Sequence, residues 1–143
     1  MITVTKIFSF DLAHALDNYP GKCRHIHGHT YSLHVTVSGD LKNLPGDPYD
    51  GMIIDFSILK SWVNTEVISI FDHALAIREN SYYDQPLVYN GKDHRVIRTH
   101  YQPTCENLLL DIHKRLQHSI PSGIFLQRLR LYETPSSYAE WNP

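Results

Sequence analysis

The sequence HGHTYSLHVTVSG, residues 27–39, alternates between apolar and polar side chains. The apolar residues share one parity: Tyr31, Leu33, Val35 and Val37. Successive side chains of a β-strand point to opposite faces, so the alternation predicts a half-buried strand that ends at Gly39. His27 and His29 have the parity of the apolar residues. Both imidazoles are therefore expected to face the core at the head of this strand.

A similar alternation occupies residues 2–12. Its apolar side chains also share one parity: Ile2, Val4, Phe8, Phe10 and Leu12. This pattern predicts a second half-buried strand, and His14 continues its apolar face. The polar loop DNYPGKCRHIHG, residues 17–28, separates the two strands and contains turn-forming residues.

Three histidines on the inward faces of two neighbouring strands indicate a metal site. If the strands pair around the loop, the imidazoles of His14, His27 and His29 meet at the edge of the core. Three imidazoles with an open fourth position are typical of a catalytic zinc ion, whereas a structural site closes all four positions. A His-x-His pair alone could be a polar strand end, but the third histidine on the matching face favours metal. We therefore predict one Zn²⁺ per chain at these side chains.

Two helices are expected after the second strand. Residues 55–70 carry apolar side chains at helical spacing, and Asp55 is suited to the N-cap position. A second helix is expected to begin at Pro103 and Thr104 and to continue to Leu116.

Further strands are expected in the second half of the chain. Residues 124–134 alternate between apolar and polar side chains, and a short closing strand is expected at 138–141. Asn90-Gly91 lies among apolar residues of the segment 87–101, which indicates a hairpin. The order of elements predicts an α+β domain with both helices on one face of an antiparallel sheet.

The composition is that of a single globular domain and argues against several classes of binding partner. The chain has 143 residues with a hydrophobic share of 42%, which fits one domain over residues 1–143 with a packed core. Its net charge of -2 and scattered cations argue against nucleic acid and membrane partners and favour a small molecule or a protein. The sequence contains no apolar run long enough to span a bilayer and no signal-peptide pattern, so a cytoplasmic location is expected.

The two cysteines, Cys23 and Cys105, are too few for a disulfide framework. Cys23 lies between the two histidine-bearing strands. It could be a fourth metal ligand, a catalytic base or nucleophile, or a small buried side chain. Cys105 has no histidine nearby in sequence and is expected to be structural.

Two other polar features, Asp72-His73 and Glu133, suggest roles in proton transfer and in ligand binding. Asp72-His73 places a carboxylate beside an imidazole, a combination suited to proton transfer, although a polar pair at a helix end is the simpler interpretation. Glu133 extends the inward parity of Leu129 and Leu131. A carboxylate that faces a core needs a partner, either the paired N–H donors of a ligand or a core arginine.

In combination, these motifs resemble a known family. They are Phe10 to His14, Cys23 followed by His27-Gly28-His29, Gly51 to Phe56, Asp72-His73, Pro103 to Asn107, and Tyr132 to Thr134. Their order and spacing are similar to those of the 6-pyruvoyl-tetrahydropterin synthase superfamily. The bacterial 6-carboxy-tetrahydropterin synthases, which serve queuosine biosynthesis, are the branch that they resemble most.

The resemblance implies a role for each matching residue. His14, His27 and His29 would bind zinc, and Cys23 would be the thiolate that abstracts a proton. Asp72 and His73 would complete the catalytic group from a neighbouring subunit. Glu133 would anchor the amino and ring N–H groups of the pterin, with help from two residues at the start of the second helix, Thr104 and Glu106.

The resemblance also implies a fold and an assembly. The tunnelling fold of this family (T-fold) has a four-stranded antiparallel sheet and two helices, and three subunits close a barrel that stacks into a dimer of trimers. Two features depart from the family pattern. The segment 78–102 is longer than expected, and Cys105 replaces a small or hydroxyl residue.

The implied reaction is a zinc-dependent lyase reaction on 7,8-dihydroneopterin triphosphate. Side-chain cleavage would release acetaldehyde and triphosphate and give 6-carboxy-tetrahydropterin, whereas triphosphate elimination would give 6-pyruvoyl-tetrahydropterin. The bacterial resemblance favours the first product. A non-catalytic pterin-binding protein and a zinc hydrolase are the alternatives.

Overall fold

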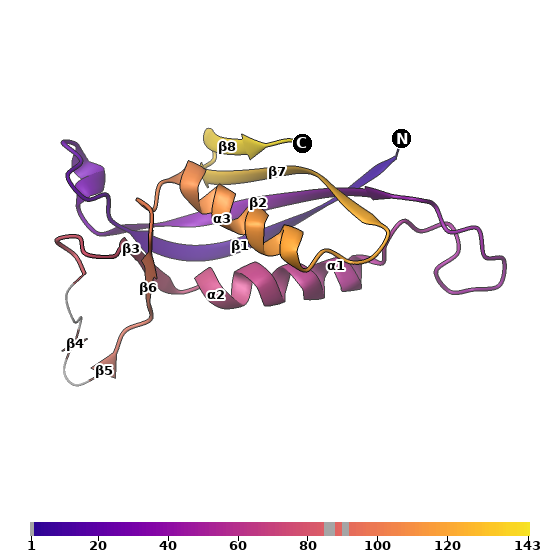
Figure 1. Cartoon of the computed structure of the whole chain (residues 1–143), viewed down its shortest axis with the longest axis horizontal. Coiled ribbons are helices and arrows are strands. Elements are labelled where there is room, and N and C mark those ends of the chain that lie inside the picture. The colour runs from indigo at the N-terminus through magenta and orange to yellow at the C-terminus, as the bar shows by residue number, and fades with distance from the viewer. Residues whose placement is uncertain (1, 85–87, 90–91) are drawn as a thin grey trace.

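The computed structural model describes residues 2–84, 88–89 and 92–143, and most of its strands form one curved sheet (Figure 1). The sheet has six strands in the order β6-β3-β1-β2-β7-β8. Their bounds are β1 Thr3–His14, β2 His27–Gly39, β3 Ala74–Arg78, β6 Val96–Thr99, β7 Ile124–Thr134 and β8 Ser137–Trp141. The two long strands β1 and β2, which the alternating patterns predict, are its centre.

The β1–β2 pair sets the inner face of the sheet. The two strands are antiparallel, and Phe10 pairs with Tyr31 and Phe8 with Leu33. All four side chains are buried, in agreement with the predicted parities. Ile2, which precedes β1, shares the parity but is exposed.

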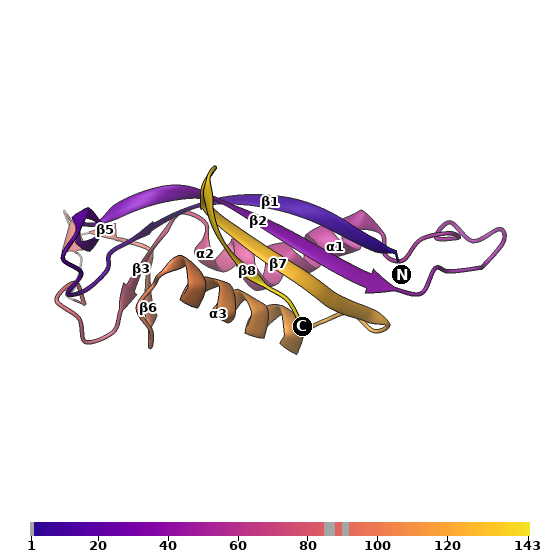
Figure 2. The ribbon, with the colours of Figure 1, turned by 90° about the horizontal axis from the view of Figure 1, so that it is seen from above.

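Two helical segments cover the inner face of the sheet (Figure 2). The first comprises α1 (Phe56–Val63), a π-helical turn (Asn64–Ile68) and α2 (Ser69–Phe71). The second is α3 (Cys105–His118).

The helix caps match the sequence-based expectations. The Asp55 side chain accepts a hydrogen bond from the Ser57 amide at 2.6 Å, as expected of an N-cap. Thr104 caps α3 by accepting a hydrogen bond from the Asn107 amide at 3.3 Å. Both helices therefore begin close to the predicted positions.

The core lies between this inner face and the helices. Leu59, Val63 and Val67 from the first helical segment and Ile112 and Leu116 from α3 are fully buried in one cluster with the strand residues. Burial of such side chains contributes about 1.5–3 kcal/mol each relative to exposure. The core thus fixes which way the even-numbered residues of β1 and the odd-numbered residues of β2 point.

The prediction of a four-stranded antiparallel sheet is wrong. The sheet is mixed, because β3 pairs parallel to β1 and β6 pairs parallel to β3. After the first helical segment the chain returns beside the free edge of β1 and extends the sheet there. β3 has only five residues and is buried on both sides over most of its length, so it lacks the alternation that marks the longer strands. The expected α+β class and the two helices are confirmed.

The expected hairpin is shorter than the segment 87–101. Val88–Tyr89 (β4) pairs antiparallel with Lys92–Asp93 (β5), while Asn90 and Gly91 lie outside the described residues. The later part of the segment, β6, belongs to the main sheet instead.

Within the described part of the chain, none of the helices has the length and apolar character needed to cross a membrane.

Candidate metal centre and cavity

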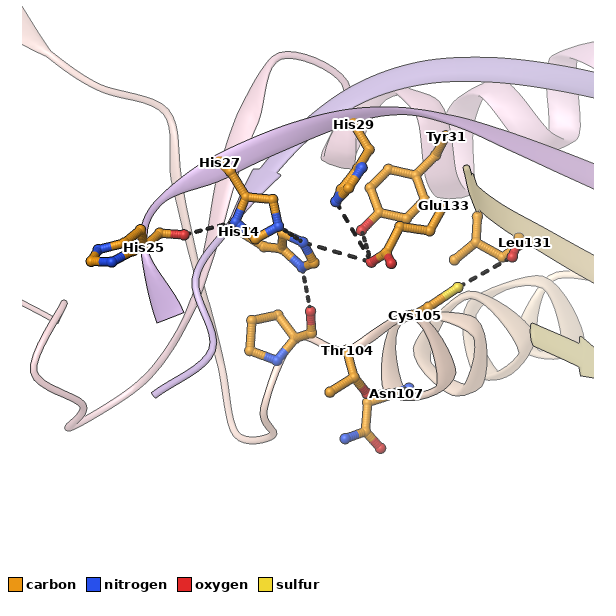
Figure 3. Close-up of polar contacts among 11 residues, drawn as sticks. His14, His25, His27, His29, Tyr31, Thr104, Cys105, Asn107, Leu131 and Glu133 are labelled. Atoms are coloured by element: carbon orange, nitrogen blue, oxygen red, sulfur yellow. Dashed lines mark hydrogen bonds and ion pairs between the residues drawn. The ribbon is translucent and has the colours of Figure 1, made fainter. Parts of the chain in front are cut away.

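The structure brings His14, His27 and His29 together at one end of the β1–β2 pair (Figure 3). His14 ends β1 opposite His27, the first residue of β2, and His29 is paired with Leu12. The ring centroids are 4.6 Å apart for His14 and His27, 5.2 Å for His14 and His29, and 5.0 Å for His27 and His29. One nitrogen of each ring lies within 4.8 Å of the other two, which makes the group able to hold one metal ion.

Backbone carbonyls orient two of the three imidazole rings, those of His14 and His27. The Nδ1–H of His14 donates to the Pro103 carbonyl at 2.7 Å, and the Nδ1–H of His27 donates to the His25 carbonyl at 2.7 Å. A carbonyl can only accept, so in a neutral ring the proton is on Nδ1 and the lone pair is on Nε2. Metal-binding histidines are commonly oriented by a carbonyl in this way.

The Nε2 lone pairs of the three histidines are placed so that a cation would stabilise them. The Nε2 atoms of His14 and His27 are 3.1 Å apart, so two lone pairs face each other in the neutral tautomers. His14 is buried, and this burial is the main cause that lowers its pKa below the ordinary value, which favours the neutral, metal-binding form. Nε2 of His29 is buried without a hydrogen-bond partner among the described residues. A divalent metal ion would satisfy all three nitrogens, and the residues therefore fit such an ion.

Glu133, near the end of β7, is close to this centre. Its Oε1 accepts a hydrogen bond from the Tyr31 hydroxyl at 3.2 Å and lies 3.6 Å and 3.8 Å from Nε2 of His14 and His29. The alternative of a salt bridge to a core arginine is wrong, because the ion-pair partners of Glu133 among the described residues are these histidines. Burial, followed by the charge of Glu133, raises the pKa of Tyr31, so its hydroxyl remains a donor.

Tyr31 is a site residue that the sequence-based expectations assigned only to the core. Its parity already placed it on the inner face one strand repeat beyond His29. A tyrosine hydroxyl buried in a core normally has a hydrogen-bond partner, and that requirement is the signal that could have linked it to Glu133.

A cavity of about 330 Å³ adjoins the metal centre. Its lining includes the predicted site residues His14, Cys23, Thr104, Glu106 and Glu133, together with Cys105. This volume lies at the lower end of the range for small-molecule sites, about 300–1,000 Å³. The cavity is therefore lined by one imidazole of the three-histidine group, two thiols and two carboxylates.

The two cysteines occupy different positions in this cavity. Cys23 lies on a short 3₁₀ turn, Lys22–Arg24, and is not part of the three-histidine group. The Cys105 thiol donates to the Leu131 carbonyl at 3.2 Å, and burial raises its pKa to about 11. Cys105 is therefore a protonated, hydrogen-bonded thiol at neutral pH, as expected of a structural cysteine.

Asp72 and His73 form a pair away from the three histidines. Asp72 Oδ2 is 3.0 Å from His73 Nδ1, and its Oδ1 accepts from the Asp11 amide at 2.9 Å. That amide is the main cause that lowers the pKa of Asp72, so the carboxylate is ionised at neutral pH. The Asp11 side chain, which belongs to the same cluster, points to the face of β1 opposite His14. Within one chain, Asp72 and His73 do not line the cavity.

Comparison with known proteins identifies the family. A family model described as 6-pyruvoyl tetrahydropterin synthase matches residues 3–143. The chain belongs to this family. The resemblance inferred from the motifs is confirmed.

Relatives in the family match along nearly the whole chain. The 6-carboxy-5,6,7,8-tetrahydropterin synthase of Haemophilus influenzae is 34% identical over 143 residues, which cover 99% of both chains. The protein of the same name from Rickettsia felis is 26% identical over 142 residues, covering 98% of this chain and 99% of the relative.

Solved structures share the fold. The crystal structure of an uncharacterized protein from Wolinella succinogenes has a TM-score of 0.78 at 20% identity and covers 99% of this chain and 97% of its own. The 6-pyruvoyl tetrahydropterin synthase of Caenorhabditis elegans has a TM-score of 0.69 at 24% identity. The match covers 99% of this chain and 95% of the C. elegans chain.

The three-histidine group leads to a prediction about metal affinity. His29→Ala removes one of the three candidate nitrogen ligands, so the affinity for Zn²⁺ should fall by more than about 100-fold. His34→Ala is the matched control, because His34 is on the same strand but on the opposite face. Competition titration with a zinc-binding dye measures both variants. Equal zinc affinity of His29→Ala and the unmodified protein would contradict this assignment.

Proposed function

We propose that this protein is a zinc-dependent lyase that converts 7,8-dihydroneopterin triphosphate to 6-carboxy-tetrahydropterin, with release of acetaldehyde and triphosphate. The observation that carries the proposal is the convergence of three imidazole nitrogens beside a cavity whose lining includes Cys23 and Glu133. The names of the relatives from Haemophilus influenzae and Rickettsia felis support the pterin product. The proposed role is a step in the synthesis of the queuosine precursor in the cytoplasm.

Zinc is the proposed metal, held by His14, His27 and His29. Three imidazoles that leave a coordination position open are a donor set typical of catalytic zinc. When bound, the ion acts as a Lewis acid that lowers the pKa of a hydroxyl group and stabilises negative charge near it. The Pro103 and His25 carbonyls keep the Nε2 lone pairs of two of these rings available for it.

Glu133 is the proposed anchor of the pterin. An ionised carboxylate is an acceptor only, and the amino and ring N–H groups of a pterin are a matching pair of donors. The Tyr31 hydroxyl holds one carboxylate oxygen in place and leaves acceptor capacity for the ligand. Thr104 and Glu106, at the start of α3, line the same cavity and would contribute further polar contacts.

Cys23 is the proposed base that takes a proton from the substrate side chain and returns one to it. Its place in the cavity but outside the histidine group supports this role over that of a metal ligand. Asp72 and His73 would assist proton transfer from a neighbouring subunit, because in one chain their cluster is on the other face of β1. The proposal therefore includes a homo-oligomer, either a trimer or a dimer of trimers, with shared active sites.

Product analysis tests the proposed reaction. Zinc-loaded protein incubated with 7,8-dihydroneopterin triphosphate should release acetaldehyde and 6-carboxy-tetrahydropterin in equal amounts, as measured by derivatisation of the aldehyde and chromatography of the pterin. Pyruvoyl product without acetaldehyde would move the assignment to 6-pyruvoyl-tetrahydropterin synthase. Binding of the substrate without turnover would indicate a non-catalytic member of the family.

The role of Cys23 is tested by Cys23→Ala. Loss of the base should lower kcat by at least about 100-fold, within the range of general acid–base contributions, while one zinc ion per chain is retained. Metal analysis and turnover are measured on the same preparation. Loss of zinc would identify Cys23 as a ligand. Full activity would instead favour a zinc hydrolase, in which a metal-activated water reacts and the thiol has no role.

The role of Glu133 is tested by Glu133→Gln, which keeps the size of the side chain but removes its charge. Loss of the charge-assisted contacts should weaken pterin binding by about tenfold or more. Zinc content should not change, because the three histidines remain. Fluorescence titration with a fully oxidised pterin such as neopterin measures the affinity. Unchanged pterin affinity together with loss of zinc would mean that Glu133 belongs to the metal site.

A further inference from the structure

Described residues of the segment that follows β3, at 79–84 and 92–102, include two that contact the loop that carries Cys23. This loop connects β1 to β2 and spans residues 15–26, and both segments lie at the same end of the molecule (Figures 1 and 2). Two side chains of the longer segment, Tyr83 and Gln102, form hydrogen bonds with the backbone of the loop. The family resemblance assigns no role to this segment.

We propose that Tyr83 and Gln102 are positioning residues that hold the Cys23 loop in its reactive conformation. The proposal rests on the proposed function in one respect, the catalytic use of Cys23. The contacts themselves, and their effect on the reactivity of the thiol, do not depend on the identity of the substrate.

Gln102 holds the start of the loop. Its Oε1 accepts from the Asp17 amide at 3.2 Å, and its Nε2 donates to the Asp17 carbonyl at 2.7 Å. The Gln102 backbone is itself fixed, because its carbonyl accepts from the Asn107 side chain at 3.0 Å and from the Thr104 amide at 2.8 Å. The loop is thereby tied to the N-terminus of α3, which lines the cavity.

Tyr83 holds the other end of the loop. Its hydroxyl donates to the Arg24 carbonyl, in the same 3₁₀ turn as Cys23. The loop is also closed on itself, because the Leu16 amide, next to the first tether, donates to the Cys23 carbonyl at 3.0 Å. Cys23 is therefore flanked by restraints on both sides.

The turn that carries Tyr83 is itself rigidly connected. The Asp84 carboxylate accepts from the Asn80 amide at 2.8 Å and from Arg98 Nε at 2.6 Å. Arg98 belongs to β6, so this turn is joined to the main sheet. The Tyr83 hydroxyl is thus supported by the sheet and not only by its own loop.

These restraints are relevant to a catalytic thiol. The 3₁₀ turn that holds Cys23 has no buried residues, so packing alone does not fix it. A displacement of a catalytic group by about 1 Å can lower a rate by about 100-fold. Removal of one tether should therefore affect turnover more than binding of the substrate or of the metal.

Tyr83→Phe tests the proposal, because it removes only the hydroxyl. Tyr82→Phe is the matched control, since the neighbouring Tyr82 is highly exposed and its hydroxyl forms no hydrogen bond with the described residues. Gln102→Ala removes the second tether independently. Each zinc-loaded protein is treated briefly with iodoacetamide, and alkylation of Cys23 and Cys105 is followed separately by peptide mass spectrometry.

The tethered loop predicts a specific pattern. In Tyr83→Phe and in Gln102→Ala, alkylation of Cys23 should become about fivefold faster, because the loop opens more often. Alkylation of Cys105 and zinc content should match the unmodified protein. In turnover assays, kcat should fall about tenfold with KM changed by less than about twofold. Tyr82→Phe should resemble the unmodified protein in every measurement.

Two results would overturn the positioning role. One is an unchanged Cys23 alkylation rate in both tether variants. The other is an equal acceleration at Cys105, which would indicate general loosening of the fold. The alkylation measurement needs no substrate, so the outcome is independent of the proposed reaction. A tethered Cys23 in a protein that does not turn over the pterin would refute the proposed function and leave the positioning role intact.

Discussion

The antiparallel register of β1 and β2 is the constraint on which the rest of the structure depends. It pairs Phe10 with Tyr31 in the core and, a few residues further along, brings His14 opposite His27. The same alternation that buries the apolar side chains turns the three imidazoles inward. A shift of the register by one residue would move a whole strand face to the other side of the sheet and would disperse the metal centre together with the core. The register that forms the core therefore also brings the three histidines together.

In the neutral tautomers, three imidazole nitrogens at this end of the sheet lack a positively charged or donating partner among the described residues. Two carbonyls place the lone pairs of His14 and His27 toward each other, and His29 adds a third buried nitrogen without a hydrogen-bond partner among the described residues. A cation satisfies all three groups, and Glu133, held by Tyr31, provides a negative charge beside it. The cavity next to these groups has the volume of a small-molecule site, and we propose that it binds the pterin.

Much of this arrangement follows from the sequence, because long alternating strands and well-capped helices have strong local signals. The strands at 2–12, 27–39, 124–134 and 138–141 and the two helices all occur near their expected positions. The strands β3 and β6 could not be predicted, because they are short and depend on parallel pairing with distant residues. The Tyr31–Glu133 bond and the tethers of the Cys23 loop also depend on tertiary contacts that no local pattern encodes. The sequence also did not show that Asp72 and His73 lie in a different cluster from the three histidines. That separation depends on which face of β1 each cluster contacts, and adjacency in sequence does not determine it.

X-ray absorption spectroscopy at the zinc K-edge, on the metal-loaded protein, tests the central claim most directly. Three imidazole nitrogens at about 2.0 Å, with the remaining coordination supplied by oxygen, are the predicted result. A sulfur atom at about 2.3 Å would make Cys23 a ligand, and fewer than three imidazoles would contradict the convergence of His14, His27 and His29 on one metal ion.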